Sequence, residues 1–310
     1  MIKQSILKTL HYFDITKFPL TKEEIFSWLW QCPNVSREQL EWELQILNEE
    51  KKIGEKYGYY FLYGGEDTVE WRRERLLSSE DKMKIALKAA KKINFIPFLR
   101  AIFVCNTVGS EQSTENSDID FLIITHPKRI WTVRLLSNLI LRLYRLRTFD
   151  KKIKNRICLS FYLDAHHLSL SNYRIVEDDI HFAYWLNQMI PVYDPDNIYA
   201  KFLQANSWSK KFLTNVDNHP IFVERLIIND SKIGKVFKKI WEKIWEGGFG
   251  NFVEKQSRLT QWLKMNAEIK NKINRGDKGI VISEGVIKLH ERDMRAHYRQ
   301  EWLKRINNIC

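Results

Sequence analysis

The segment Asp118-Ile119-Asp120-Phe121-Leu122-Ile123-Ile124 decides the fold that we expect for this chain of 310 residues. Its apolar part is typical of a central strand that is buried on both faces of a sheet. Because side chains at positions i and i+2 of a strand point the same way, Asp118 and Asp120 are predicted to project side by side. Two carboxylates so close repel each other unless a cation offsets their charge, and oxygen ligands at this spacing suit Mg²⁺. The segment therefore predicts a metal site beside a buried strand.

Two further strands are predicted, one on either side of this one. Residues 101–105 form a continuous apolar run before it, and residues 157–163 are predicted to form a third strand after it. A turn-rich stretch over residues 106–117 joins the first two strands, and an amphipathic helix is predicted over residues 130–146. In the last strand, simple alternation places Ser160, Tyr162 and Asp164 on one side and Leu159, Phe161 and Leu163 on the other.

The order of these features resembles the nucleotidyltransferases of the DNA polymerase-beta-like superfamily. Their motif is Gly-Ser at a turn after the first strand, followed by Asp-x-Asp on the next. Without a gap, Asn106 and Thr107 occupy the Gly-Ser positions, with ten residues before Asp118. We favour this register because Asn tolerates the left-handed conformation and Thr retains the hydroxyl. The alternative register uses Gly109 and Ser110 and leaves only seven residues before Asp118.

The resemblance covers residues 98–165 and implies a set of functional residues. Asp118, Asp120 and a third carboxylate would hold two Mg²⁺ ions. Asp164 fits the third position, where the family residue helps to activate the attacking hydroxyl; the alternative is a turn residue at the end of a strand. The residues implied to lie near the phosphates of a nucleoside triphosphate are Asn106, Thr107, Gly109, Ser110 and Ser117.

The positive charge is concentrated in two blocks. The chain has a net charge of +12, with +9 in residues 121–160 and +8 in residues 221–310. Such blocks indicate a polyanionic ligand, a nucleotide or nucleic acid, with a solvated basic face as the alternative. Arginine side chains form paired, charge-assisted hydrogen bonds to phosphates. Three arginines of the helix at 130–146 are predicted to form one phosphate-binding stripe: Arg134, Arg142 and Arg145.

The first 66 residues predict three helices followed by a β-hairpin, which is the order of a winged helix. Thr21 and Ser36 are the expected N-caps of the second and third helices, with a capping box at Thr21. Residues 1–70 carry a net charge of −4, and the third helix holds four glutamates against Arg37 alone. Such a surface would repel the DNA backbone. We therefore expect a packing or partner-binding module.

These observations predict an α+β fold in three parts. Residues 1–66 would form the winged-helix-like domain, residues 67–177 a small mixed-sheet nucleotidyltransferase core, and residues 178–310 a helical C-terminal domain. This layout also resembles a group of bacterial predicted nucleotidyltransferases, in part through residues 289–295. Within that stretch, His290 and Asp293 are expected to be a structural pair on one helix face.

The leading prediction is a Mg²⁺-dependent enzyme that moves a nucleoside monophosphate from a nucleoside triphosphate to a hydroxyl acceptor, with a nucleic acid or a protein as possible acceptors. The alternative is a non-catalytic, winged-helix DNA- or partner-binding protein with a degenerate transferase core; a nucleotidyltransferase-like toxin or its partner is a third possibility. Charged residues interrupt the most apolar stretch, so no membrane partner is expected. The four cysteines show no metal-ligand spacing, which favours a reduced, cytoplasmic protein.

Overall fold

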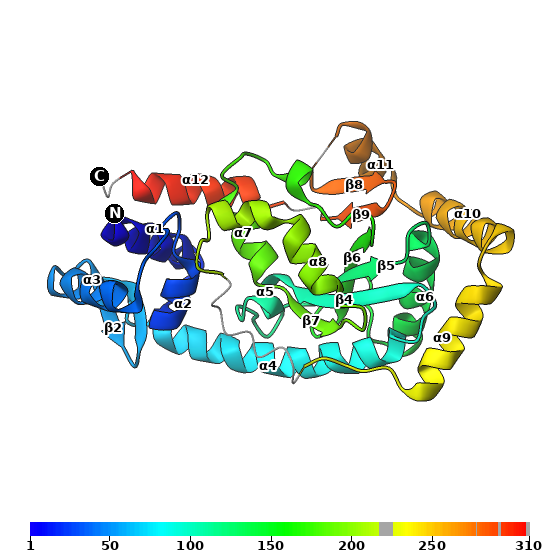
Figure 1. The fold of residues 1–310 in the computed structure, drawn as a ribbon, viewed down its shortest axis with the longest axis horizontal. Coiled ribbons are helices and arrows are strands. Elements are labelled where there is room, and N and C mark those ends of the chain that lie inside the picture. The colour runs from blue at the N-terminus through cyan, green and yellow to red at the C-terminus, as the bar shows by residue number, and fades with distance from the viewer. Residues whose placement is uncertain (217–225, 277, 291–292, 308–310) are drawn as a thin grey trace.

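The computed structural model describes residues 1–216, 226–276, 278–290 and 293–307, and these form an α+β protein with two sheets. One sheet has three antiparallel strands in the order β1-β3-β2, and the other has six strands in the order β7-β4-β5-β6-β9-β8. Figure 1 shows the small N-terminal sheet at one end of the molecule and the larger sheet at its centre. The predicted α+β class is confirmed.

The N-terminal part contains the three helices and the hairpin that the sequence predicts. Its elements are α1 (Ile2–Asp14), β1 (Leu20–Thr21), α2 (Lys22–Trp28), α3 (Arg37–Glu49), β2 (Ile53–Lys56) and β3 (Tyr59–Leu62). The capping box at Thr21 is present, because its side chain accepts from the Glu24 amide and the Glu24 carboxylate accepts from the Thr21 amide. Ser36 caps α3 in the same way, with Gln39 as its partner. Both caps satisfy amides that a helix start leaves unpaired.

The large sheet is built around the three predicted strands. Its strands are β4 (Leu99–Cys105), β5 (Ile119–Thr125), β6 (Ile157–Asp164), β7 (Ile190–Tyr193), β8 (Ile280–Ser283) and β9 (Val286–Leu289). Strands β5 and β6 are parallel, and the other neighbours are antiparallel. The prediction of a separate helical domain over residues 178–310 is wrong, since β7, β8 and β9 extend the central sheet. These strands have four residues each, too few to show a strand period among helices.

Helices cover both faces of the large sheet. On one face, α4 (Thr68–Ile93) and α6 (Ile130–Leu143) pack on the side chains of Ile119, Phe121 and Ile123, as the alternation in β5 predicts. On the other face, α7 (Ile180–Asn187) and α8 (Ile198–Ala205) pack on Leu122 and Ile124. Four further helices follow towards the C-terminus: α9 (Lys232–Ile244), α10 (Gly248–Leu263), α11 (Ala267–Asn274) and α12 (Arg295–Ile306).

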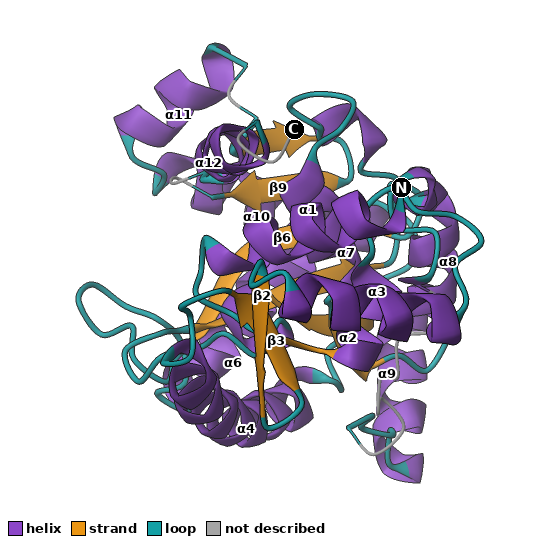
Figure 2. Cartoon of the chain, turned by 90° about the vertical axis from the view of Figure 1, so that its left-hand side faces the viewer, coloured by secondary structure: helices purple, strands orange, loops and turns teal. Residues whose placement is uncertain are grey.

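The N-terminal elements share their core with distant parts of the chain. Trp302 of α12 and Tyr184 of α7 are buried together with the apolar residues of α1, α2 and α3. Figure 2 shows α1, α7 and α12 close together, and the two chain ends lie on the same side of the molecule in Figure 1. The core of residues 1–66 is therefore completed by residues from the predicted C-terminal part.

Candidate metal and nucleotide site

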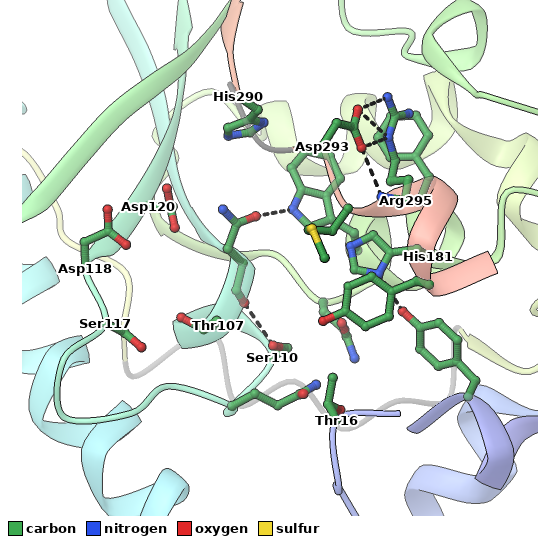
Figure 3. Close-up of a pocket in the computed structure, with 18 of the residues that line it drawn as sticks. Thr16, Thr107, Ser110, Ser117, Asp118, Asp120, His181, His290, Asp293 and Arg295 are labelled. Atoms are coloured by element: carbon green, nitrogen blue, oxygen red, sulfur yellow. Dashed lines mark hydrogen bonds and ion pairs between the residues drawn. The ribbon is translucent and has the colours of Figure 1, made fainter. Parts of the chain in front are cut away.

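Asp118 and Asp120 lie side by side where β5 begins. Asp120 is level with Cys105 of β4 on one side and with Cys158 of β6 on the other. One ligand atom from each of Asp118, Asp120 and Cys158 lies within 4.8 Å of the other two. Asp120 is buried and Asp118 is partly exposed. Figure 3 shows both carboxylates at one end of a cavity, as their spacing in the strand predicts.

The surroundings of the two carboxylates disfavour their ionisation. Burial raises the pKa of Asp118. Burial and the charge of Asp118 together raise the pKa of Asp120 to about 7, against hydrogen bonds from Asn106 and Cys158 and the charge of Arg147. Burial and the two carboxylates hold the pKa of the Cys158 thiol far above its usual range, so the thiol stays protonated and donates. A divalent cation would supply the positive charge that this pair lacks.

The turn that follows β4 approaches the carboxylates. It forms a single helical turn, α5 (Asn106–Gly109), and Asn106 has a left-handed φ of 55°. The side chain of Trp185 holds Asn106 in place, because its Nε1 donates to Asn106 Oδ1 at 2.6 Å. Asn is favoured in this conformation among residues other than glycine, as expected from the sequence for Asn106.

Four of the eight predicted nucleotide-binding residues line one cavity of about 350 Å³. Its wall near the carboxylates is formed by Asn106, Thr107, Ser110, Ser117, Asp118 and Asp120. Gly109 does not line this cavity: a Cβ atom there would lie 2.9 Å from the carbonyl oxygens of Val104 and Gln188. Gly109 is therefore a packing residue, which corrects its predicted role.

The other end of the cavity comes from residues that the sequence did not identify as part of a site. They include His181 on α7 and, near the end of the chain, Lys288, His290, Asp293, Arg295 and Tyr298. Figure 3 shows His181, Asp293 and Arg295 on the side of the cavity opposite Asp118. Residues 289–295 contributed to the resemblance described above, but their sequence pattern did not indicate that they lie near the strand with Asp118 and Asp120.

Asp293 organises the charges at this end. Although burial opposes its ionisation, Arg295 and Lys288 hold the pKa of Asp293 far below its usual range. Arg295 Nε donates to Asp293 at 2.8 Å, and Lys288 Nζ lies 3.6 Å from the same carboxylate. Burial and Arg295 lower the pKa of Lys288 to about 8. Asp293 thus partly neutralises both the lysine and the arginine, and Arg295 also lies 3.4 Å from the carboxylate of Asp179.

The expected pairing of His290 with Asp293 on a helix face is wrong. Strand β9 ends at Leu289 and α12 begins at Arg295, so the two residues lie in the connection between them, of which residues 291–292 are outside the described part. His290 Nε2 instead lies 3.0 Å from Ser160 Oγ. Burial lowers the pKa of His290 to about 4, so this imidazole is neutral at pH 7.

Asp164 does not join the two carboxylates. Along the parallel pair, Asp120 is level with Cys158, whereas Asp164 is level with Thr125 at the far end of β5. Asp164 lies six positions after Cys158 along the strand, which corresponds to about 20 Å. Asp164 instead accepts from the His166 amide at 2.9 Å and lies 2.7 Å from His167 Nδ1. The prediction of Asp164 as the third metal ligand is wrong, because strand pairing places it at the opposite edge of the sheet.

The predicted alternation in β6 also fails. The pairing of β5 with β6 shifts between Asp120 and Leu122, which marks a bulge or irregularity. As a result, Leu159 and Tyr162 pack into the core beneath α4 and α6, and Phe161 and Leu163 pack into the opposite core. An extra residue in one strand reverses the side on which the following side chains point.

The prediction that three arginines form one phosphate-binding stripe is wrong as well. Helix α6 ends at Leu143, so Arg145 lies beyond it, with a left-handed φ of 55°. Arg134 donates to Gln261 of α10 at 2.5 Å, and Arg142 lies over the ring of Phe149. Arg134, Arg142 and Arg145 are all absent from the lining of the cavity.

Another arginine of the same basic block influences the carboxylates. The positive charge of Arg147 lowers the pKa of both Asp118 and Asp120, against the effect of burial. Arg147 is oriented by Asn138, to which its Nε donates at 2.8 Å, and by the Ile157 carbonyl at 3.0 Å. Arg147 lies beyond the end of the helix, so the helical period could not predict its orientation. The positive charge of residues 121–160 was the one feature of the sequence that pointed to it.

Comparison with known proteins found no family model that matches this chain and no curated protein with a similar sequence. A search for membrane spans among the described helices found none that is both long and apolar enough.

Proposed function

We propose that this protein is a Mg²⁺-dependent nucleotidyltransferase, which transfers a nucleoside monophosphate from a nucleoside triphosphate to a hydroxyl acceptor. The observation that carries the proposal is the pair of carboxylates, Asp118 and Asp120, on the wall of a cavity beside the left-handed turn at Asn106. A strand, a tight turn and an Asp-x-Asp strand are also the features on which the resemblance to the superfamily rests.

The donor set fits a divalent cation. Asp118 and Asp120 would hold it, and Mg²⁺ commonly binds one or two carboxylates together with water and substrate phosphate. When bound, the cation supplies positive charge to the phosphates and lowers the pKa of a coordinated hydroxyl. The hydroxyls of Thr107, Ser110 and Ser117 line the same end of the cavity and offer donors to phosphate oxygens. The neutral Cys158 donates to the carboxylates and holds them in place.

A second candidate function is nucleotide binding without transfer. Among the described His, Cys, Asp and Glu residues, the third group that lies close to the two aspartates is Cys158. A protonated thiol cannot accept the proton of an attacking hydroxyl. This observation favours a core that binds a nucleotide and has lost part of its catalytic chemistry.

The N-terminal elements follow the order of a winged helix, and we propose that they bind a partner other than DNA. Glu38 and Glu41 are exposed on α3, where DNA phosphates would be repelled.

The thiols of Cys32 and Cys105 are buried and form no disulfide, which suits a reducing cytoplasm.

The test offers the full-length protein each of the four nucleoside triphosphates, labelled on the α-phosphate, with Mg²⁺ and candidate RNA or protein acceptors. Incorporation of label that Asp118→Asn abolishes would support the transferase. Binding of Mg²⁺-nucleotide without incorporation under any condition would support the second candidate. If the wild-type protein binds none of the four nucleotides, both functions are excluded. Arg142→Ala, which leaves the cavity intact, is the matched control.

A further inference from the structure

Helix α9 is attached to the protein by its polar side. Lys238 donates to the Asn94 carbonyl at 3.3 Å and to the Tyr193 hydroxyl at 2.9 Å, and it is buried. Glu242, one turn further on, accepts from the Phe98 amide at 2.6 Å and from Arg100 at 2.7 Å. A surface helix usually buries its apolar stripe and exposes its charges, and α9 does the opposite.

The apolar stripe of α9 faces outward. Its six members recur at helical spacing and remain 83, 59, 41, 52, 36 and 53% exposed: Ile233, Val236, Phe237, Ile240, Trp241 and Ile244. At about 100° per residue they fall within an arc of roughly 140°. Exposed apolar side chains in one continuous stripe mark an interaction surface, whereas single ones do not.

Helix α10, at the same end of the molecule, also carries exposed apolar side chains. It too is attached by polar groups, because Glu254 accepts from the Trp131 and Thr132 amides at 2.8 Å and Gln261 donates to the Trp131 carbonyl at 2.9 Å. Its exposed apolar side chains are Phe249, Phe252, Leu259 and Leu263. Figure 1 shows α9 and α10 together at one end of the molecule, opposite the N-terminal helices. We call these ten side chains on α9 and α10 the outer apolar face.

The charges around the outer apolar face are mostly positive. Four lysines of α9 lie along one flank of the stripe, within an arc of about 80° at 100° per residue: Lys232, Lys235, Lys239 and Lys243. All four are exposed. Of the three acidic residues in 232–263, Glu242 and Glu254 turn inward to the contacts described above, and Glu246 lies between the two helices. The outer apolar face is thus bordered by basic side chains.

We propose that α9 and α10 bind the surface of an anionic lipid bilayer. Apolar and aromatic side chains on one helix face, bordered by lysines, are the features of helices that lie in the membrane interface. Anionic headgroups complement the lysine flank. A second copy of the chain would instead bring the same excess of lysines to the contact. Lying on a membrane differs from spanning it, and the expectation of no membrane partner rested on the absence of a span.

The test measures co-sedimentation of the full-length protein with vesicles of phosphatidylcholine and with vesicles of equimolar phosphatidylcholine and phosphatidylglycerol. The wild type is expected to bind the anionic vesicles and to be released as salt is raised. The apolar variant Ile233→Ser/Ile240→Ser and the charge variant Lys235→Glu/Lys239→Glu are each expected to weaken binding by about tenfold or more. None of these four side chains takes part in the contacts that attach α9, so the variants should keep the wild-type thermal transition.

Matched controls separate this surface from general adhesion. Trp42→Ser removes an aromatic side chain that is 62% exposed on α3, at the opposite end of the molecule. Lys84→Glu/Lys88→Glu reverses two exposed lysines of the same spacing on α4. Both controls should bind as the wild type does. Failure of the wild type to bind anionic vesicles would overturn the proposal. A dimer in sedimentation velocity that Ile233→Ser/Ile240→Ser dissociates would assign the face to a second copy and overturn it as well.

Discussion

At the scale of single residues, the ionised carboxylates of Asp118 and Asp120 destabilise the folded protein, and a bound cation would remove this destabilisation. Both are disfavoured in the charged form by burial, and Asp120 is further disfavoured by its neighbour. Carboxylates at such close range repel each other and weaken the folded state, and the charge of Arg147 does not outweigh this repulsion and the effect of burial. The site is therefore expected to show itself in stability measurements as well as in activity.

Mg²⁺ is expected to raise the melting temperature of the wild-type protein. A ligand present at about 100 times its dissociation constant stabilises the folded state by about 2.7 kcal/mol. Asp120→Asn should abolish the response to Mg²⁺ and should raise the melting temperature measured in a chelator, because it removes the repulsion. Differential scanning calorimetry with and without Mg²⁺ checks both effects. A response to Mg²⁺ that survives in Asp120→Asn would place the cation elsewhere.

Cys158 occupies the level of β6 where a third carboxylate would meet the other two. Cys158→Asp would add a general base within reach of the site, and general base catalysis contributes about a hundredfold or more. We expect nucleotidyl transfer to rise by that order when Mg²⁺ is present. Cys158→Asn is the matched control, because asparagine has nearly the same shape as aspartate and carries no charge. Equal transfer rates of the two variants would contradict this role of position 158.

At the scale of elements, the turn α5 depends on close packing against β4 and against Gln188, which directly follows α7. A Cβ atom at Gly109 would approach two backbone oxygens to 2.9 Å. Gly109→Ala is expected to lower the free energy of unfolding by about 1–3 kcal/mol, the usual cost of overpacking. Gly248→Ala at the start of α10 meets nothing within 4 Å and should change it by about 1 kcal/mol or less. Urea denaturation of both variants measures the difference.

At the scale of the whole molecule, His181 joins three distant elements. Its Nδ1 lies 2.8 Å from the Tyr12 hydroxyl of α1, and its ring stacks on Tyr298 of α12 at 4.4 Å between centroids. Burial and the nearby Arg295 lower the pKa of His181 to about 4, against the charge of Asp293. The residue is therefore neutral at pH 7 where it contacts α1 and α12.

This pKa makes stability depend on pH. Because the folded-state pKa of His181 lies below its ordinary value of 6.5, the unfolded state binds more protons between pH 6.5 and about 4. The free energy of unfolding should therefore fall as pH is lowered through this range. His181→Gln, which keeps a hydrogen-bonding group near Tyr12, should reduce that slope. Denaturation at pH 7, 6 and 5 compares the two proteins, and parallel slopes would contradict the assignment.

Local chemistry was enough to predict several parts of this protein. The capping residues Thr21 and Ser36, the apolar run at 101–105 and the paired direction of Asp118 and Asp120 all follow from neighbours within a few residues. Such features depend on hydrogen bonds and on side-chain periods that the chain carries in any environment. They were correct for that reason.

Contacts between distant segments determined the features that the sequence did not predict. The position of Asp164 depends on how β6 aligns with β5, and the pairing shift after Asp120 changes which side chains meet. The amphipathic pattern of α9 identifies an apolar face, but whether that face is buried depends on Lys238 and Glu242 finding partners more than a hundred residues away. Strand register and helix orientation depend on the free energy of all contacts in the folded molecule. A pattern within a few neighbouring residues does not determine that free energy.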